Sequence, residues 1–345
     1  MHGEHTIREI FGQPELWPRV GEHLVSALSV SALGGVREVV FVGCGSSYHL
    51  AEAGAKLLAD WAGVRTRFAP ASELILFPNT LLSGDAQLAL VALSRTGTTS
   101  EVLEAIKVFR GRAGAAAPVV GITCAPESPL VEACDFPIVI PSREASVVMT
   151  QAFTGTLLAL AGWALSLRPD PLRAAALREA VRHAEAPLRQ SDALKALAAW
   201  PVRNFVFLGG GLLHAIASEG ALKLQEMALE PSAIAFHALE YRHGPKSTVG
   251  PDTLVTLLFS EAGSTYEAAL LDELKGLGAR TLAIATADQA AIASRADAHF
   301  LVEASSDATR ALLYTPLLQL LAYHRAVRNG TDPDAPRHLS RSVIL

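Results

Sequence analysis

Two short turns in the first third of the chain gather hydroxyl groups that could bind a phosphate. The segments "GCGSS" (43–47) and "SRTGTTSE" (94–101) each follow an apolar run and precede a helical pattern. A helix N-terminus offers unpaired N–H groups and the positive end of the helix dipole. Six hydroxyl-bearing residues flank these helix starts: Ser46, Ser47, Ser94, Thr96, Thr98 and Thr99. The cluster favours a phosphate site without lysine over the alternative in which these residues only cap helices.

The second turn has a copy later in the chain. The segment "SEAGSTYE" (260–267) repeats "SRTGTTSE" after 166 residues, with glycine at the same place in both. Thr98 with Glu101, and Ser264 with Glu267, fit the spacing of a capping box, so both copies are predicted to cap a helix in this way. The later copy lacks the paired serines, and Glu261 brings a negative charge there. We therefore expect only the first copy to hold a phosphate.

A second candidate for chemistry is the helical segment "ASEGALKLQEMALE" (217–230). Glu219, Lys223 and Glu226 share one face of this helix, because they are spaced by four and three residues. A carboxylate on a helix wall is suited to moving a proton between two adjacent carbon atoms. The alternative is an ordinary solvated face of ion pairs.

The turns and the helix belong to a repeat that spans most of the chain. The segment "REVVFVGCGSS" (37–47) resembles "RNFVFLGGGLL" (203–213), and the apolar runs 118–123 and 134–140 resemble 281–286 and 296–302. Short apolar runs separated by helical patterns predict a buried parallel sheet in each copy, with four strands alternating with helices. Ligands bind beyond the carboxyl ends of such strands, which is where both hydroxyl-rich turns lie.

Composition sets the class of protein. The 345 residues suffice for about two domains, and 50% hydrophobic with 18% charged residues excludes disorder. A net charge of −5 without a basic block argues against nucleic-acid binding. Three cysteines without a CxxC pattern, and no signal peptide, favour the cytoplasm. The apolar segment 151–167 is interpreted as a buried helix and not a membrane span. No spacing typical of metal ligands occurs, and no cofactor is expected.

Four segments together carry a family likeness: "GCGSSY", "SRTGTTSEV", "ALKLQEMALEPSAIAFHALEYRHGPKS" and "PRHLSRSVIL". They resemble the SIS (sugar isomerase) family, and within it the double-SIS isomerase half of glucosamine-6-phosphate synthase and the related amino-sugar-phosphate deaminases and fructosamine-phosphate deglycases. The resemblance implies an α/β fold of two tandem SIS domains, each a three-layer αβα sandwich. The domains would be 1–190 and 191–332, with 333–345 as a tail that closes the site. It also implies a phosphosugar substrate bound between the sandwiches of a homodimer.

The resemblance also assigns roles to individual residues. Glu226 would move the proton between C1 and C2, with Lys223 as its electrostatic partner. His243 would assist ring opening and come from the partner subunit, and His237 is its rival. The binding residues would be Cys44, Gly45, Ser46, Ser47, Ser94, Arg95, Thr96, Thr99, Val147 and Met149.

Two departures from the synthase pattern shape the expected function. Arg341 occupies the position of a lysine that forms an imine with the ketose, and a guanidinium stays protonated and forms no imine. A glutamine-hydrolysing domain is not expected, because the first SIS domain starts close to Met1 and no cysteine follows it. The leading interpretation is an isomerase of a hexose or amino-hexose 6-phosphate, with deamination or deglycation. A non-catalytic sugar-phosphate regulator, and a synthase subunit fed with ammonia, are the alternatives.

Overall fold

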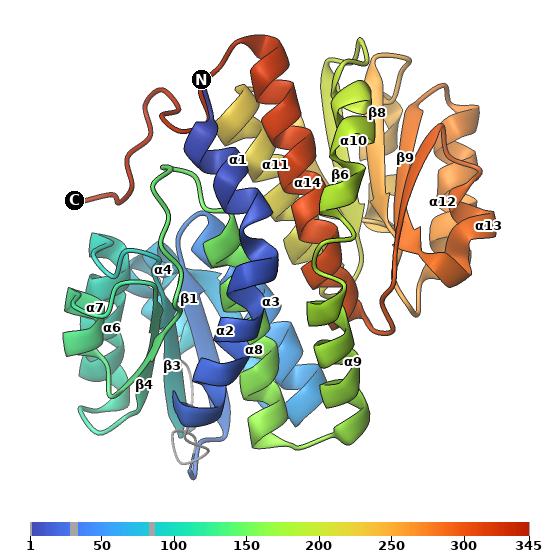
Figure 1. Ribbon diagram of the computed structural model, residues 1–345. Coiled ribbons are helices and arrows are strands. Elements are labelled where there is room, and N and C mark those ends of the chain that lie inside the picture. The colour runs from blue at the N-terminus through green and yellow to red at the C-terminus, as the bar shows by residue number, and fades with distance from the viewer. Residues whose placement is uncertain (1, 28–33, 83–86, 345) are drawn as a thin grey trace. The chain divides into compact units, whose positions relative to one another are not determined.

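The computed structural model describes residues 2–27, 34–82 and 87–344, which form two compact units. We call the first of them the first-sheet unit; it comprises Glu15–Glu144, Gln151–Ala174 and Ser340–Leu345. The other, the second-sheet unit, comprises Met1–Pro14, Ala145–Thr150 and Ala175–Leu339. Each unit contains one five-stranded parallel sheet with helices on both faces (Figure 1). The predicted pair of three-layer α/β sandwiches is therefore confirmed.

The sheet of the first-sheet unit has the order β2-β1-β3-β4-β5. Its strands are β1 (Glu38–Gly43), β2 (Arg65–Pro70), β3 (Leu88–Leu93), β4 (Val119–Thr123) and β5 (Phe136–Val139). Its helices are α2 (Gln13–Ala27), α3 (Ser46–Leu57), the π-helical turn Leu58–Ala62, α4 (Ala71–Leu76), α5 (Pro78–Leu81), α6 (Ser100–Ala113), α7 (Pro129–Ala133) and α8 (Gln151–Leu167). β1 pairs with β3 in parallel register, Val40 opposite Leu90. The carboxyl ends of these two strands therefore lie next to each other.

The second-sheet unit repeats this order as β7-β6-β8-β9-β10. Its strands are β6 (Asn204–Gly209), β7 (Ala233–His237), β8 (Thr253–Leu258), β9 (Arg280–Thr286) and β10 (Ala298–Val302). Its helices are α1 (Glu4–Phe11), α9 (Pro171–Arg182), α10 (Ser191–Ala198), α11 (Leu213–Ala228), α12 (Ser264–Gly276), α13 (Ala290–Ala293) and α14 (Asp307–Asn329), with single 3₁₀ turns at Leu188–Gln190, Glu240–Arg242, Pro245–Thr248 and Ala287–Gln289. β6, β8 and β9 are the central strands, and the predicted apolar run 281–286 lies within β9.

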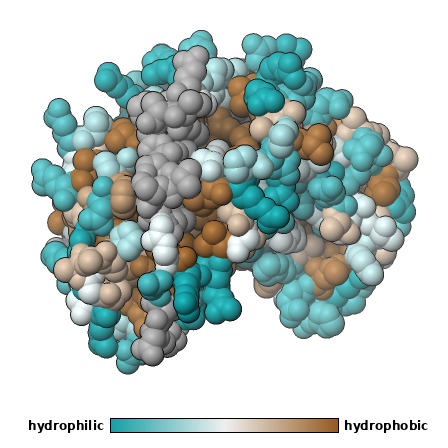
Figure 2. All heavy atoms as spheres, turned by 90° about the horizontal axis from the view of Figure 1, so that it is seen from below, coloured by the Kyte–Doolittle hydropathy of each residue, from teal (hydrophilic) through white to brown (hydrophobic). Residues whose placement is uncertain are grey.

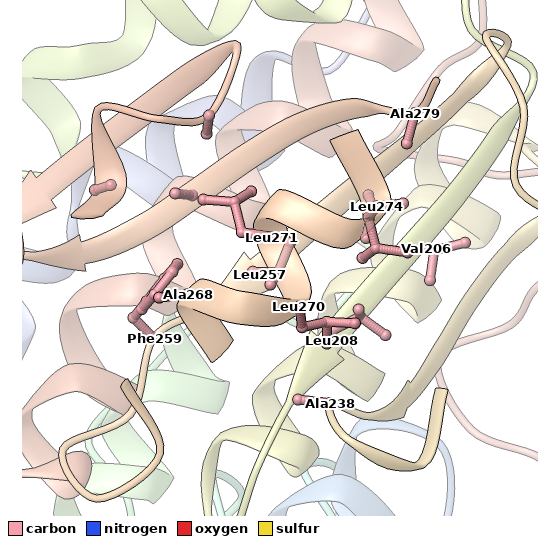
Figure 3. Packing of buried hydrophobic residues seen from close by; sticks show 14 of the residues in the cluster. Val206, Leu208, Ala238, Leu257, Phe259, Ala268, Leu270, Leu271, Leu274 and Ala279 are labelled. Atoms are coloured by element: carbon pink, nitrogen blue, oxygen red, sulfur yellow. The ribbon is translucent and has the colours of Figure 1, made fainter. Parts of the chain in front are cut away.

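Alternate residues of the central strands face opposite helical layers, which is why these strands are continuous apolar runs. In the first sheet, Val40 and Leu90 pack in one cluster with Phe109 of α6, whereas Phe41 of β1 lies against Trp163 of α8, with ring centroids 6.4 Å apart. In the second sheet, Val206, Leu208 and Leu257 pack against the Leu270–Leu274 stretch of α12 (Figure 3). The two cores hold the strand ends, and with them the turns, in fixed positions.

The sequence analysis predicted four strands per copy, and this number is wrong by one. The additional strands are β2 and β7, which lie at an edge of their sheets. β2 reads "RTRFAP", and most of its side chains are partly or fully exposed. β2 carries two arginines and a proline, so it lacks the apolar run by which the other strands were found. β7 reads "AIAFH" and was missed although it contains a short apolar run.

The apolar segment 151–167 forms α8, whose residues are mostly buried, as expected of a core helix. Among the residues that the structure describes, no helix combines the length and the apolar character that a membrane span requires. On the face that Figure 2 shows, hydrophilic residues cover much of the surface and hydrophobic residues lie between them in smaller groups. Most of the apolar side chains counted in the sequence are in the two cores.

Candidate functional site

Both hydroxyl-rich turns of the first-sheet unit are shaped by glycines. β1 ends at Gly43 and α3 begins at Ser46; a side chain at Gly43 would clash with the Ser47 carbonyl, and Gly45 has φ +56°. β3 ends at Leu93, and Gly97 in the following turn has φ +66° and no room for a Cβ beside Ser128. Only glycine accepts these backbone conformations without strain. They place both turns at the carboxyl edge of neighbouring strands, as the sequence predicted.

The hydroxyls of the second turn form a bonded cluster. Ser94 Oγ lies 2.9 Å from Thr99 Oγ1 and accepts the Gly97 N–H at 3.1 Å. Thr98 Oγ1 donates to Thr96 Oγ1 at 2.9 Å. Since a hydroxyl can rotate its proton toward an incoming oxygen, this cluster can supply several donors to one phosphate at the start of α6.

Cys44 lies between β1 and α3. Burial, and then the neighbouring Glu101 carboxylate, raise the pKa of the Cys44 thiol to about 12. The thiol is therefore protonated at neutral pH and is no nucleophile.

The two predicted capping boxes are wrong. Helix α6 has Thr99 as its N-cap and α12 has Gly263, and neither N-cap has a side chain that accepts a backbone N–H of its helix. The side chains have other partners: Thr99 bonds Ser94, and Glu267 bonds Ser260. The spacing of a capping box was present, but tertiary partners outcompeted the local bonds.

In the later turn of the repeat, the Glu267 carboxylate accepts the hydrogen bonds that the turn can donate. Glu267 accepts hydrogen bonds from the Ser260 N–H and the Ser260 hydroxyl, both at 2.8 Å, and Gly263 N–H donates to Ser260 Oγ at 2.9 Å. The Glu267 side chain is buried, and burial raises its pKa although the bonds from Ser260 lower it. In the first copy the equivalent serine, Ser94, contacts the Thr99 hydroxyl instead of a carboxylate.

Helix α11 carries a buried ionic triad in the second-sheet unit. Lys223 is completely buried, lies 3.3 Å from Glu219, and contacts Glu226 directly. Burial opposes its charge, but Glu219 and Glu226 together raise the pKa of Lys223, so it remains a cation. The alternative of a solvated ion-pair face is wrong, because only Glu226 reaches solvent, with 19% of its side chain exposed. One charged ammonium thus holds one accessible carboxylate in place.

His243 follows a 3₁₀ turn, and neighbours on both sides of it anchor its loop. Arg242 and Lys246 both bind Glu273, at 2.8 and 2.5 Å, and the His243 N–H donates to the Glu240 carbonyl at 2.9 Å. His243 itself is exposed. The rival His237 instead stacks on His214, with ring centroids 3.9 Å apart. Of the two histidines, His243 is the one presented on an anchored loop.

The segment with Val147 and Met149 is held by its backbone. The Glu9 carboxylate of α1 accepts the N–H groups of Ala145 and Ser146, and Val147 N–H donates to the Asp334 carbonyl at 3.2 Å. Met149 is buried. Glu9 was not found by sequence reasoning, because nothing in the local pattern of α1 shows which backbone groups its carboxylate meets.

Arg341 lies in a pocket of the first-sheet unit with a volume of about 300 Å³. Its guanidinium donates to the Glu144 carbonyl, and the neighbouring Ser342 hydroxyl lies 3.0 Å from Thr98 Oγ1. The pocket is lined by Arg95, Thr96, Cys124, Ala125, Ser142, Arg143, Glu144, Ala152 and Arg341. Ser142, Arg143 and Glu144 were missed by sequence reasoning, since they follow the last strand and match no recognised motif.

The predicted site residues thus fall into two groups. The first-sheet unit holds Cys44, Gly45, Ser46, Ser47, Ser94, Arg95, Thr96, Thr99 and Arg341, and the second-sheet unit holds Val147, Met149, Lys223, Glu226 and His243. Within the described ranges, no group of three or more His, Cys, Asp or Glu side chains is arranged to hold a metal ion.

The chain is similar to several known proteins. It is 32% identical to the glutamine–fructose-6-phosphate aminotransferase (isomerizing) of Thermosynechococcus vestitus and 30% identical to that of Gloeobacter violaceus, over 99% and 98% of this chain. The chain spans 59% and 58% of the length of these relatives.

Solved structures extend the comparison. The glucosamine-6-phosphate deaminase of Thermotoga maritima is 31% identical with a TM-score of 0.81, and covers 99% of this chain and 100% of its own. The tagatose-6-phosphate ketose/aldose isomerase of Escherichia coli shares the fold, with a TM-score of 0.84 at 24% identity, and covers 99% of this chain and 96% of its own. The family model of the SIS domain matches residues 33–165 and again 200–328, one match for each sheet. The chain therefore belongs to the SIS domain family.

Proposed function

We propose that this chain is an enzyme that isomerises an amino-hexose 6-phosphate and releases its amine, working as a cytoplasmic homodimer. The observation that carries the proposal is the hydroxyl cluster at 94–99, whose donors are arranged for a phosphate while the equivalent donors at 260–267 hold Glu267. The likeness to a structure named glucosamine-6-phosphate deaminase, over the full chain, supports an amino sugar as the substrate.

The phosphate is the anchor of the substrate in this proposal. Ser47, Ser94, Thr96 and Thr99 donate to its oxygens, and the start of α6 adds backbone N–H groups and the dipole. The Cys44 thiol beside them stays neutral because its pKa is about 12, so it does not repel the dianion. Binding of the phosphate contributes affinity, and the chemistry takes place at the other end of the sugar.

Glu226 is the proposed base. In the open-chain sugar it removes the proton from the carbon next to the carbonyl or imine, and the same carboxyl returns a proton to the neighbouring carbon. With an amine at C2 of the aldose, this transfer produces a C2 imine. Water adds to that imine, ammonia leaves, and the ketose 6-phosphate remains. With a substituted amine at C1 of the ketose, the same transfer produces a C1 imine, and water then releases the amine.

The remaining proposed residues support this proton transfer. The cationic Lys223 fixes one oxygen of Glu226 and balances its charge. His243 of the partner subunit opens the sugar ring, since a neutral imidazole can both donate and accept a proton near pH 7. Arg341 forms no imine, and this favours hydrolytic release of the amine over its incorporation.

The proposal is tested with a panel of hexosamine and fructosamine 6-phosphates, in which amine release and ketose formation are scored separately. Release of ammonia or of a substituted amine, together with the isomerised sugar, is the expected result. Tight binding of the same sugar phosphates without any conversion would contradict the proposal and support a non-catalytic regulator.

A further inference from the structure

One glutamate of the second-sheet unit binds two cations that flank His243. One oxygen of Glu273, on α12, accepts from Arg242 Nε at 2.8 Å, and the other lies 2.5 Å from Lys246 Nζ. Arg242 directly precedes His243, and Lys246 follows it after Gly244 and a proline. Both oxygens of this carboxylate therefore fasten the segment 242–246 to α12 on either side of the histidine.

The rest of the segment is anchored mainly at its start. Tyr241 is completely buried, and its ring centroid lies 5.3 Å from that of Phe236. After His243 the backbone turns at Gly244, whose φ of +135° favours glycine. The Ser247 N–H then donates to the Gly244 carbonyl at 3.0 Å, which is a bond within the segment itself. The ion pair from Lys246 is thus what connects the far side of the turn to α12.

The Glu273 carboxylate remains charged over the range in which an imidazole titrates. The hydrogen bond from Lys246 is the largest of the effects that hold the pKa of Glu273 below its ordinary value of 4.5. An imidazole titrates about two pH units higher. The two ion pairs therefore persist whether His243 is neutral or protonated, as is needed around a group that both accepts and donates a proton.

We infer that Glu273 is a positioning residue for ring opening, because it holds the segment 242–246 so that the imidazole of His243 meets the ring of the sugar. The inference rests on the proposed function, which assigns ring opening to His243. In this step the anomeric hydroxyl loses its proton, the bond between the anomeric carbon and the ring oxygen breaks, and the ring oxygen takes up a proton. One imidazole can serve both oxygens only from a narrow range of positions, and a small displacement of a catalytic group lowers the rate.

Ring opening can be measured without isomerisation, because the two anomers of a sugar interconvert only through the open chain. We expect the Glu226→Gln protein, in which conversion is blocked, to accelerate the interconversion of the anomers of glucosamine 6-phosphate in NMR exchange spectra. Adding Glu273→Gln should lower this acceleration about fivefold, which corresponds to the loss of one exposed ion pair or more. Adding His243→Ala should abolish it. An unchanged acceleration with Glu273→Gln would overturn the inference.

Asp272→Asn is the matched control, added to the Glu226→Gln protein in the same way. Asp272 is the neighbour of Glu273 on α12, is exposed, and pairs with Arg295 at 2.7 Å, away from the segment 242–246. It should leave anomer interconversion unchanged, and Glu273→Asp, which keeps the charge, should retain most of the acceleration. Urea denaturation should show similar small losses of stability for Asp272→Asn and Glu273→Gln. Equal effects of these two variants on anomer interconversion would show a merely structural role.

Two further results separate this inference from the proposed function. If the wild-type protein releases no amine but the Glu226→Gln protein accelerates anomer interconversion, the proposed function fails and the inference stands. If there is no acceleration, His243 opens no ring and the inference is wrong. Hydrogen exchange tests the anchoring itself: the His243 and Ser247 amides should exchange faster in Glu273→Gln than in Asp272→Asn. Equal exchange in both variants would contradict the anchoring.

Discussion

The turns at 94–101 and 260–267 share a hydrogen bond between the turn glycine and a serine, but that serine has a different side-chain partner in each turn. In both, a serine after the strand accepts the N–H of the turn glycine: Gly97 to Ser94 at 3.1 Å, and Gly263 to Ser260 at 2.9 Å. In the first turn this serine contacts the Thr99 hydroxyl, whereas in the later turn it contacts the Glu267 carboxylate. The repeated octapeptide thus forms the same turn in both sheets, with a hydroxyl as the partner of the serine in one and a carboxylate in the other.

The glutamates of the two turns also have different partners. Glutamate stands at the same place in both octapeptides, as Glu101 and Glu267. Glu101 lies beside Cys44 Sγ, at 3.8 Å, whereas the equivalent of Cys44 is Gly210, which leaves the Glu267 carboxylate space. A methyl group added to Gly210 would lie 3.7 Å from Glu267, which is an ordinary contact distance. Cysteine at this position in the first copy instead brings its Sγ to the equivalent glutamate.

The largest effect on turnover is expected at Glu226, the base that we propose in the second-sheet unit. Glu226→Gln keeps the shape and removes the base, so kcat should fall by ~10²–10⁴. The KM for sugar phosphate should change little, because the proposal assigns the phosphate to the turns of the first-sheet unit. Steady-state kinetics measure both constants. Near wild-type turnover would refute the role of Glu226.

A matched pair of serine variants separates the two turns directly. Ser94→Ala should raise KM by about tenfold to a hundredfold, because a donor to a charged phosphate is lost. Ser260→Ala should leave KM unchanged and lower the free energy of unfolding by ~1–3 kcal/mol, since it leaves the buried Glu267 short of donors. Kinetics and urea denaturation of both variants provide the comparison. Equal rises in KM would show that the later turn also binds phosphate.

The internal carboxylate predicts a pH dependence of stability. Burial raises the pKa of Glu267 above its ordinary value of 4.5, so the folded state binds its proton more tightly than the unfolded state does. Stability from this group is therefore present below pH 4.5 and is lost as pH rises through the raised pKa, by ~1.4 kcal/mol for each unit of the shift. Urea denaturation across this range should show the loss in the wild-type protein and not in Glu267→Gln. A parallel course for both proteins would contradict this account.

The smallest effect concerns the tail. Arg341 cannot form an imine, so borohydride added during turnover should attach no sugar to residues 333–345. Mass spectrometry of the C-terminal peptide checks this. Arg341→Lys is the informative companion, because it restores an amine at the same position. A sugar adduct on the wild-type tail would contradict the assignment of Arg341 as a binding residue.

The central strands could be predicted from the sequence, because they are buried on both faces and appear as unbroken apolar runs. The edge strand β2, "RTRFAP", was missed because it has no such run, whereas β7, "AIAFH", was missed although it has a short one. The glycine turns were predicted because their backbone constraint is local. The partners of Glu9 and Glu267 were not, because they depend on which groups the fold brings near a carboxylate. Spacing identified Glu226 and Lys223 as neighbours, but their burial became visible only in the structure.

A crystal structure determined with a hexose 6-phosphate tests the central claim most directly. The account predicts phosphate at the 94–99 turn, with donors from Ser94 and Thr99, and the Glu267 carboxylate still bound to Ser260. Phosphate at the 260–265 turn with Glu267 displaced, and none at 94–99, would contradict it.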